Sequence, residues 1–222
     1  MVEAPLLELR NVSKTYENGF RAVKEVSYSI GKGMLVGLIG PNGCGKSTMM
    51  KCINRIHPTT SGEILVNGES VLNRTPGELA KVISNVPAEL NTSFGLTVAE
   101  TVMMGRYPHS TNLWWESDRD ESFTEEAMHK FGVFGLKDRY LHTLSSGERQ
   151  RVLIAKAYVQ EPKLMLVDEP TSHLDMRYKL EVMEYLNAMV KKDMSILIAE
   201  HDISLMARYR DLCIIMKEGS LF

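Results

Sequence analysis

The stretch Gly40-Pro41-Asn42-Gly43-Cys44-Gly45-Lys46-Ser47-Thr48 decides the fold of this 222-residue chain. It fits the pattern G-x-x-x-x-G-K-[ST], in which a glycine-rich turn directs successive backbone N–H groups at phosphate oxygens. The apolar run Met34–Ile39 predicts a strand that enters the loop, and Ser47–Ile56 predicts a helix that leaves it. The N-terminus of that helix adds a dipole that favours an anion. A glycine-rich turn with a chance lysine would not explain this register of strand, loop and helix.

We therefore expect a nucleoside triphosphate site at residues 40–48. Lys46 is expected to reach the β- and γ-phosphates, and the Ser47 hydroxyl is expected to hold Mg²⁺.

Composition narrows the classes of protein that fit. The net charge is −2 and no strongly basic run occurs, which argues against a nucleic-acid partner. The three cysteines, Cys44, Cys52 and Cys213, form no C-x-x-C pair and no zinc spacing, as expected for reduced thiols in the cytosol. No apolar stretch approaches the roughly 18 residues that a membrane span needs. We expect one domain, or one domain with a lobe inserted into it.

Two stretches near the N-terminus alternate apolar and polar residues, as half-exposed strands do. Residues Leu6–Ile30 follow this pattern around a turn at Asn18-Gly19, and Glu63–Val66 precedes a second turn at Asn67-Gly68. Antiparallel pairing is therefore predicted for this part of the chain.

The pattern changes after a short predicted strand at Val82–Val86, which Pro87 ends. Helices separated by loops follow to about residue 160, and strands then alternate with a helix, which predicts a parallel sheet covered by helices. The helices are expected at Val98–Met104, Glu121–Phe134, Glu148–Val159 and Arg177–Val190. The later strands are expected at Lys163–Val167, Ser195–Ala199 and Leu212–Met216, the last with a partner strand that continues after Phe222.

A pair of carboxylates ends the strand around residues 164–167. Asp168 and Glu169 would lie at the carboxyl end of a parallel strand, where ligands bind in such sheets. We expect Asp168 to hold the Mg²⁺ hydration shell opposite Ser47, and Glu169 to polarise the attacking water as general base. An ordinary solvated turn is the alternative, and the phosphate loop upstream favours the catalytic interpretation.

The order of motifs resembles the ATP-binding-cassette ATPases over nearly the whole chain. After the phosphate loop come Leu144-Ser145-Ser146-Gly147-Glu148, Asp168-Glu169, Ser172-His173-Leu174-Asp175 and His201. The resemblance implies an α/β, P-loop NTPase fold with a RecA-like parallel-sheet core, an N-terminal antiparallel β subdomain and an inserted α-helical subdomain. The core is expected at residues 1–86 and 161–222, and the helical subdomain at 87–160.

The resemblance also implies a head-to-tail dimer in which ATP lies between two copies. The signature segment, Ser145, Ser146, Gly147 and Glu148, would close over the ATP bound by the phosphate loop of the partner, Gly40–Thr48. The commoner segment is Leu-Ser-Gly-Gly-Gln, so Ser146 and Glu148 are departures that we expect to be tolerated. Ser145 and Glu148 also have the spacing of a helix capping box, which is compatible with ligand binding.

Three further residues match positions of the family. Tyr16 matches the aromatic residue that stacks on adenine, His201 resembles the switch histidine that touches the γ-phosphate, and Asp175 matches the aspartate that crosses the dimer interface. For Tyr16 and His201, a purely structural role is the alternative.

One departure concerns catalysis. The family places a glutamine after Val-Pro at the start of the helical lobe, where this chain has Ala88 followed by Glu89. Ala88 cannot coordinate anything, and Glu89 would substitute only if the loop shifted by one residue. The efficiency of hydrolysis and its coupling to the helical lobe are therefore in doubt.

Several segments resemble the cassettes that energise uptake of iron chelates, haem and cobalamin, in particular Gly105-Arg106-Tyr107-Pro108-His109 and Glu148–Ala155. The resemblance implies ATP and Mg²⁺, a homodimer, integral membrane permease subunits and, indirectly, an extracytoplasmic substrate-binding protein. It places the chain in the cytoplasm, on the inner face of the membrane. Phe94–Met104 and the Trp114-Trp115 pair are candidates for the permease contact, although the tryptophans could instead anchor the helical lobe to itself.

Two alternatives remain open. One is a cassette of the same class for zinc, manganese or another cargo, and the other is a nucleotide-gated clamp with weak hydrolysis because of Ala88. Glu169 and His201 argue against the clamp. A mechanical cassette that acts on nucleic acid would be expected to carry a basic surface or a coiled-coil insertion, and neither is visible.

Overall fold

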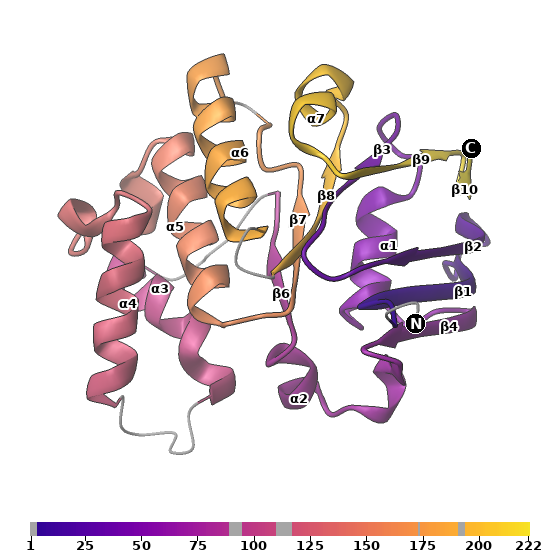
Figure 1. Cartoon of the computed structure of the whole chain (residues 1–222), viewed down its shortest axis with the longest axis horizontal. Coiled ribbons are helices and arrows are strands. Elements are labelled where there is room, and N and C mark those ends of the chain that lie inside the picture. Colours follow the sequence, from indigo (N-terminus) through magenta and orange to yellow (C-terminus); the bar gives the residue numbers. More distant parts are fainter. Residues whose placement is uncertain (1–3, 89–94, 110–116, 173, 191–193) are drawn as a thin grey trace.

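The computed structural model describes residues 4–88, 95–109, 117–172, 174–190 and 194–222. Two sheets organise this part of the chain (Figure 1). The larger has the order β10-β9-β3-β8-β7-β6, in which β9, β3, β8, β7 and β6 run parallel and β10 is antiparallel to β9. Its strands are β3 (Leu35–Ile39), β6 (Ile83–Val86), β7 (Leu164–Asp168), β8 (Ser195–Glu200), β9 (Leu212–Lys217) and β10 (Ser220–Leu221).

The central parallel strands β3, β7 and β8 are apolar and buried on both faces, because other elements cover both. In β7, Leu164 and Leu166 pack toward the cluster that contains α1 (Lys46–Ile53), whereas Met165 and Val167 pack toward the cluster that contains the later helices. Each strand contributes to two cores, which fixes the register of the sheet.

The smaller sheet is antiparallel, with the order β2-β1-β4-β5. Helix α1 packs between the two sheets, and its buried Met49, Met50 and Ile53 share one core with both. The helix that follows the phosphate loop is thereby fixed from two sides. The strands are β1 (Leu7–Thr15), β2 (Arg21–Ile30), β4 (Ser61–Val66) and β5 (Glu69–Ser70).

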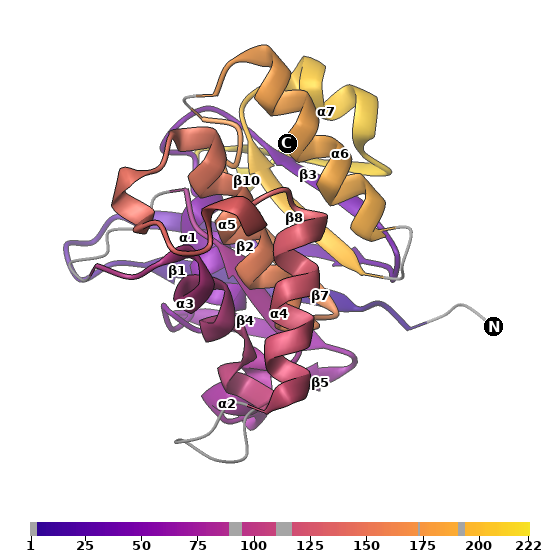
Figure 2. The ribbon, with the colours of Figure 1, turned by 90° about the vertical axis from the view of Figure 1, so that its left-hand side faces the viewer.

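Three helices gather at one end of the molecule, on the left in Figure 1 and toward the viewer in Figure 2. They are α3 (Val98–Met103), α4 (Asp118–Lys130) and α5 (Ser146–Val159). Helices α6 (Met176–Val190) and α7 (Ile203–Tyr209) lie together at the top of Figure 1, and α2 (Pro76–Ala80) lies at the bottom. Short 3-10 turns complete the order: η1 (Val71–Asn73), η2 (Met104–His109), η3 (Phe134–Leu136) and η4 (Leu141–Thr143).

The predicted strands and longer helices are present, with shifted ends. Helix α4 begins earlier than predicted because Ser117 caps it, and it ends at Lys130 because Gly132 adopts φ +65°. Helix α1 ends at Ile53, before Arg55 with φ +59°. The partner strand that the sequence predicts for β9 begins within the described residues, because β10 pairs with β9 at Ser220–Leu221.

The segment Gly105–His109, which resembles importer cassettes, attaches η2 to α5. A Cβ atom on Gly105 would lie 2.2 Å from the carbonyl oxygen of Lys156, so η2 approaches α5 through a position that only glycine fits. The buried guanidinium of Arg106 forms ion pairs of 2.7 Å with Asp120 of α4 and with Glu161 just beyond α5. Gly105 and Arg106 therefore connect η2 to both α4 and α5.

In the part of the chain that the structure describes, no helix is long and apolar enough to cross a membrane.

Candidate nucleotide site

The phosphate loop runs from the end of β3 to the start of α1 with no space beside two of its glycines. A Cβ atom on Gly40 would lie 2.2 Å from the carbonyl oxygen of Met216. Gly45 adopts φ +108°, and a Cβ atom there would lie 2.2 Å from the carbonyl oxygen of Ala22. Side chains are excluded at both positions, which keeps the backbone of the loop in its curled form.

Lys46 folds back over this loop. Its ammonium donates hydrogen bonds to the carbonyl oxygens of Gly40 at 2.8 Å and Pro41 at 3.3 Å, and its side chain is 3% exposed. The same nitrogen lies 3.9 Å from Oε1 of Glu169. The lysine thus stands between the loop and the carboxylate pair that ends β7.

The Ser47 hydroxyl donates a hydrogen bond of 3.0 Å to Oδ1 of Asp168. Burial raises the pKa of Asp168 above its usual value, although the hydrogen bond from Ser47 opposes that shift. A hydroxyl and a partly desolvated carboxylate are oxygen ligands of the kind that Mg²⁺ prefers. The donor set therefore fits the cation that the sequence predicts at these two residues.

Glu169 is held at the carboxyl end of the sheet by its own backbone. Its N–H donates to the carbonyl oxygen of Ala199 at 2.9 Å, which ties it to β8, and its φ of +45° turns the chain away from β7. Its Oε2 accepts a hydrogen bond of 3.3 Å from the Ser172 hydroxyl. The carboxylate is therefore fixed beside Lys46 without being fully buried.

His201 follows β8, which lies between β3 and β7 in the sheet. Its side chain is 49% exposed, and its backbone N–H donates to Oε2 of the buried Glu200 at 3.0 Å. Asp202 caps α7 by accepting from the N–H of Leu205 at 3.0 Å. The histidine is thus fixed between a strand end and a helix start.

Tyr16 lies against the helix that follows the phosphate loop. Its hydroxyl forms a hydrogen bond of 3.1 Å with Oγ1 of Thr48, and His57 meets its ring edge-on with centroids 5.7 Å apart. The Lys14 ammonium lies 5.4 Å from the ring centroid. The ring is half-buried, which leaves part of its surface for a base.

The signature segment begins α5 and forms a capping box. Ser145 Oγ accepts from the N–H of Glu148 at 3.3 Å, and Oε2 of Glu148 accepts from the N–H of Ser145 at 2.8 Å and from its hydroxyl at 2.7 Å. These bonds lower the pKa of Glu148. Among the described residues, no hydrogen bond or ion pair joins Ser145, Ser146, Gly147 or Glu148 to the phosphate loop of the same chain.

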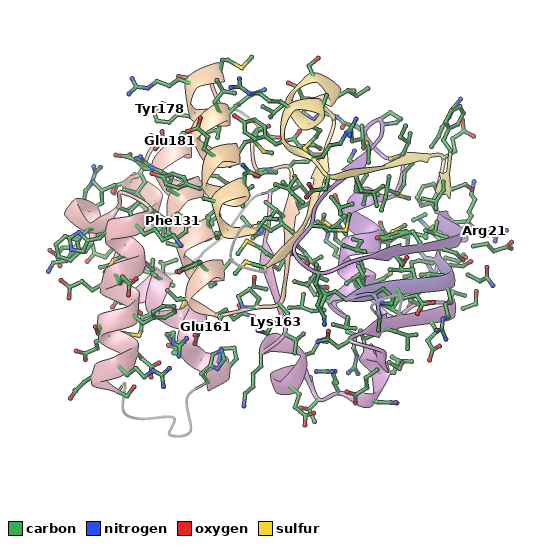
Figure 3. All side chains as sticks on the ribbon, in the orientation of Figure 1. Arg21, Phe131, Glu161, Lys163, Tyr178 and Glu181 are labelled. Atoms are coloured by element: carbon green, nitrogen blue, oxygen red, sulfur yellow. The ribbon has the colours of Figure 1, made fainter. Side chains whose placement is uncertain are left out.

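Asp175 precedes α6 and accepts a hydrogen bond of 3.0 Å from the N–H of Tyr178 through Oδ1. The Tyr178 ring packs on the signature segment, since a Cβ atom on Gly147 would lie 3.2 Å from it (Figure 3). The start of α6 and the start of α5 are therefore in contact. His173, between Ser172 and Leu174, lies outside the described residues.

The sequence profile of the ABC transporter family matches residues 23–172, which is more than half of the chain. The chain belongs to the ABC transporter family. A cobalamin import ATP-binding protein of Halobacterium salinarum is 37% identical over 90% of this chain, which spans 50% of that relative. An iron(3+)-hydroxamate import ATP-binding protein of Bacillus subtilis is 36% identical over 90% of this chain and 74% of its own length.

Solved structures of ABC transporter proteins share the fold. The cbiO1 protein of Clostridium perfringens, part of the ABC transporter complex cbiONQ, matches with a TM-score of 0.87 and 31% identity over 99% of this chain and 88% of its own. A bacterial ABC transporter cassette solved as a dimer matches with a TM-score of 0.86 and 28% identity over 97% of this chain and 96% of its own. The predicted α/β cassette fold is confirmed.

Ala88, which stands where ABC transporter cassettes usually have a glutamine, is exposed. It follows β6 on the surface, and its methyl group cannot coordinate a metal or form a hydrogen bond to water. Glu89, the proposed substitute, lies outside the described residues, as do the Trp114-Trp115 pair and Phe94.

Sequence reasoning missed two buried polar residues of this cassette, Thr171 and Glu200, which are both 0% exposed. Because Glu200 directly precedes the predicted switch histidine, the sequence places it close to the candidate site. The sequence does not predict its burial, because a glutamate at a strand end is ordinarily solvated.

Proposed function

We propose that this chain binds and hydrolyses ATP as the energising subunit of an ABC importer for iron chelates or cobalamin. The observation that carries the proposal is the meeting of Lys46, Ser47, Asp168 and Glu169, which come from two segments more than a hundred residues apart. The relatives that import cobalamin and iron(3+)-hydroxamate support the class of cargo.

In this proposal the loop at residues 40–48 binds the phosphates through its backbone and Lys46, and the Tyr16 ring stacks on adenine. Ser47 and Asp168 would hold Mg²⁺, which neutralises charge on the phosphates when bound. Glu169 accepts a proton from the attacking water, because its carboxylate stands beside the lysine that binds the phosphate to be cleaved. His201 contacts the γ-phosphate from the end of β8.

The proposal includes a dimer. The signature segment makes no hydrogen bond or ion pair with the phosphate loop within the described chain, yet it presents a serine and the N-terminus of a 14-residue helix. Such an N-terminus favours a phosphate group. A second copy, related by two-fold symmetry, would bring Ser145 to the nucleotide of the first and Asp175 to the shared interface.

The permease contact is proposed at a groove between α3 and α4 with a volume of about 280 Å³. Its wall is apolar, with Met103, Met128 and Phe134. Three glutamates and one lysine also line it, namely Glu100, Glu121, Glu125 and Lys137. Charge complementarity favours an amphipathic permease segment with basic residues. This contact would place the chain at the cytoplasmic face of a membrane.

A second candidate function is a nucleotide-gated clamp that binds ATP and turns it over slowly. The exposed Ala88 favours it, because the position that would contact the attacking water carries no polar group. The two functions differ in rate and not in the residues that bind ATP.

Steady-state phosphate release by the purified chain tests the proposal, beside Glu169→Gln and Ala88→Gln. We expect turnover by the natural chain, loss of about 10²-fold or more in Glu169→Gln since the base is removed, and equal or faster turnover in Ala88→Gln. Turnover that appears only in Ala88→Gln would favour the clamp. Equal turnover by the natural chain and Glu169→Gln would reject Glu169 as the base.

A further inference from the structure

Glu200 is a fully buried carboxylate that the proposed chemistry does not use. It ends β8, is 0% exposed, and both of its oxygens are occupied. The Thr171 hydroxyl donates to Oε1, and the backbone N–H of His201 donates to Oε2 at 3.0 Å. A buried carboxylate is retained in a protein only where such partners compensate its lost hydration.

The two donors belong to the two segments that flank the reacting phosphate in the proposed function. Thr171 is itself 0% exposed and lies two residues after Glu169. His201 is itself the predicted switch histidine and directly follows β8. Glu200 is therefore a direct link between the loop of the general base and the loop of the histidine.

The electrostatics of this link act on the imidazole. Nδ1 of His201 lies 3.7 Å from Oε2 of Glu200, and within the described ranges no other cation forms an ion pair with this carboxylate. The carboxylate lies beside Nδ1, which leaves Nε2 as the ring nitrogen available to a ligand. We expect this contact to favour one orientation of the half-exposed imidazole.

We infer that Glu200 is a positioning residue that holds His201 and the loop of Glu169 in one arrangement. The inference rests on the proposed function of those two residues in ATP hydrolysis. Glu200 is fully buried, and it acts through the hydrogen bonds that it accepts from Thr171 and His201.

Three substitutions separate positioning from mere stability. Glu200→Ala removes both hydrogen bonds, and Thr171→Val removes one of them from the opposite side with little change of shape. Glu200→Gln keeps an acceptor for His201 and a donor for the Thr171 oxygen while it removes the charge. Asp211→Ala is a matched control, because Asp211 accepts a hydrogen bond of 2.7 Å from the N–H of Leu35 at the other end of the sheet.

We expect Glu200→Ala and Thr171→Val to lower kcat by about 10- to 100-fold, the loss expected when a reacting group is misplaced, with the KM for ATP unchanged. Glu200→Gln should retain most of the activity, and Asp211→Ala should lower Tm without lowering kcat. A wild-type kcat in both Glu200→Ala and Thr171→Val would overturn the inference. So would a loss of kcat that Asp211→Ala reproduces.

A second measurement is independent of turnover. The imidazole NMR signals of His201 should form one sharp set in the natural chain and in Glu200→Gln, and should broaden or split in Glu200→Ala and Thr171→Val. Unchanged signals in those two variants would overturn the inference. Absence of ATP turnover by the natural chain, with the expected NMR result, would reject the proposed function and leave the link between Glu200 and His201 supported.

Discussion

Glu148 in the signature segment and Asp168 beside the phosphate loop carry negative charges that repel an anionic ligand. Glu148 is ionised at neutral pH because Ser145 donates two hydrogen bonds to it, which lower its pKa. The Ser145 hydroxyl is turned toward this carboxylate and would have to turn away to bind a phosphate. The departure from glutamine at this position therefore weakens the proposed contact with ATP.

Glu148→Gln is expected to strengthen ATP-dependent dimerisation by about three- to tenfold, since it removes roughly 1 kcal/mol of repulsion between like charges. The capping box survives, because glutamine also accepts from the N–H of Ser145. Sedimentation at several ATP concentrations measures the effect. Glu78→Gln is the matched control, because Glu78 forms the same capping box with Thr75 on α2; equal effects of both variants would contradict the prediction.

At Asp168, a carboxylate that the proposed chemistry needs lowers the stability of the ligand-free chain. Burial raises its pKa in the folded chain, so its contribution to stability is complete below the unfolded pKa and is lost as pH rises through the folded pKa. At neutral pH the ligand-free chain therefore holds a partly desolvated carboxylate at a cost in free energy.

Asp168→Asn should raise the Tm of the ligand-free chain by about 1–3 °C at pH 7, and the difference should shrink toward pH 4 as the natural carboxyl group takes up its proton. The same variant should lose Mg²⁺-dependent turnover. Thermal unfolding at the two pH values, without nucleotide, measures the first effect. A lower Tm of Asp168→Asn than of the natural chain at pH 7 would show that burial of the carboxylate does not dominate its effect on stability.

Sequence motifs supplied the residues of the candidate site, but they did not reveal all of the contacts among them. The order of phosphate loop, carboxylate pair and histidine placed Lys46, Asp168 and His201, because each follows an apolar run that predicts a strand of one parallel sheet. The link through Glu200 was not predictable, since it depends on burial and on a hydroxyl 29 positions away.

At the scale of elements, helices with clear apolar periodicity were predicted, and two of the three shortest helices in the described part of the chain, α2 and α7, were missed. Helix α5 was expected from residue 148 and begins at Ser146, because the capping box extends the helix by one half-turn. Helices α2 and α7 have five and seven residues, too few for periodicity to stand out. Their caps at Thr75 and Asp202 were the available signals.

The contact between η2 and α5 is the element-scale feature that tolerates change least. Gly105→Ala would place a methyl group 2.2 Å from the carbonyl oxygen of Lys156 and 2.6 Å from a Val159 methyl. We expect a loss of about 1–3 kcal/mol in the free energy of unfolding, measured by urea denaturation. Gly135→Ala is the control, since nothing lies within 4 Å of that position. Comparable losses in both variants would contradict the prediction.

At the scale of the whole molecule, the helical end presents a groove lined by three glutamates and one lysine, and the sheets present the candidate nucleotide site. The groove between α3 and α4 was not visible in the sequence, because its lining residues come from both helices and from η3. Only the fold brings Glu121 and Glu125 beside Glu100. The proposed permease contact therefore belongs to this scale and not to any single motif.

Reversing one charge in the groove tests that contact. Glu121→Lys is expected to weaken association with the permease subunits by about tenfold or more, since like charges would then face each other, while ATP turnover by the isolated chain stays unchanged. Co-purification of the complex measures association. Glu25→Lys, on the exposed part of β2, is the matched charge reversal; equal weakening by both would place the contact elsewhere.

The central claim is that two copies share each ATP and that Glu169 is needed to release them. Sedimentation of Glu169→Gln with and without saturating ATP tests it most directly, because binding survives in this variant while activation of water is lost. We predict a monomer without ATP and a dimer with ATP, at a larger dimer fraction than the natural chain shows. Equal dimer fractions in the natural chain and in Glu169→Gln at saturating ATP would contradict the claim.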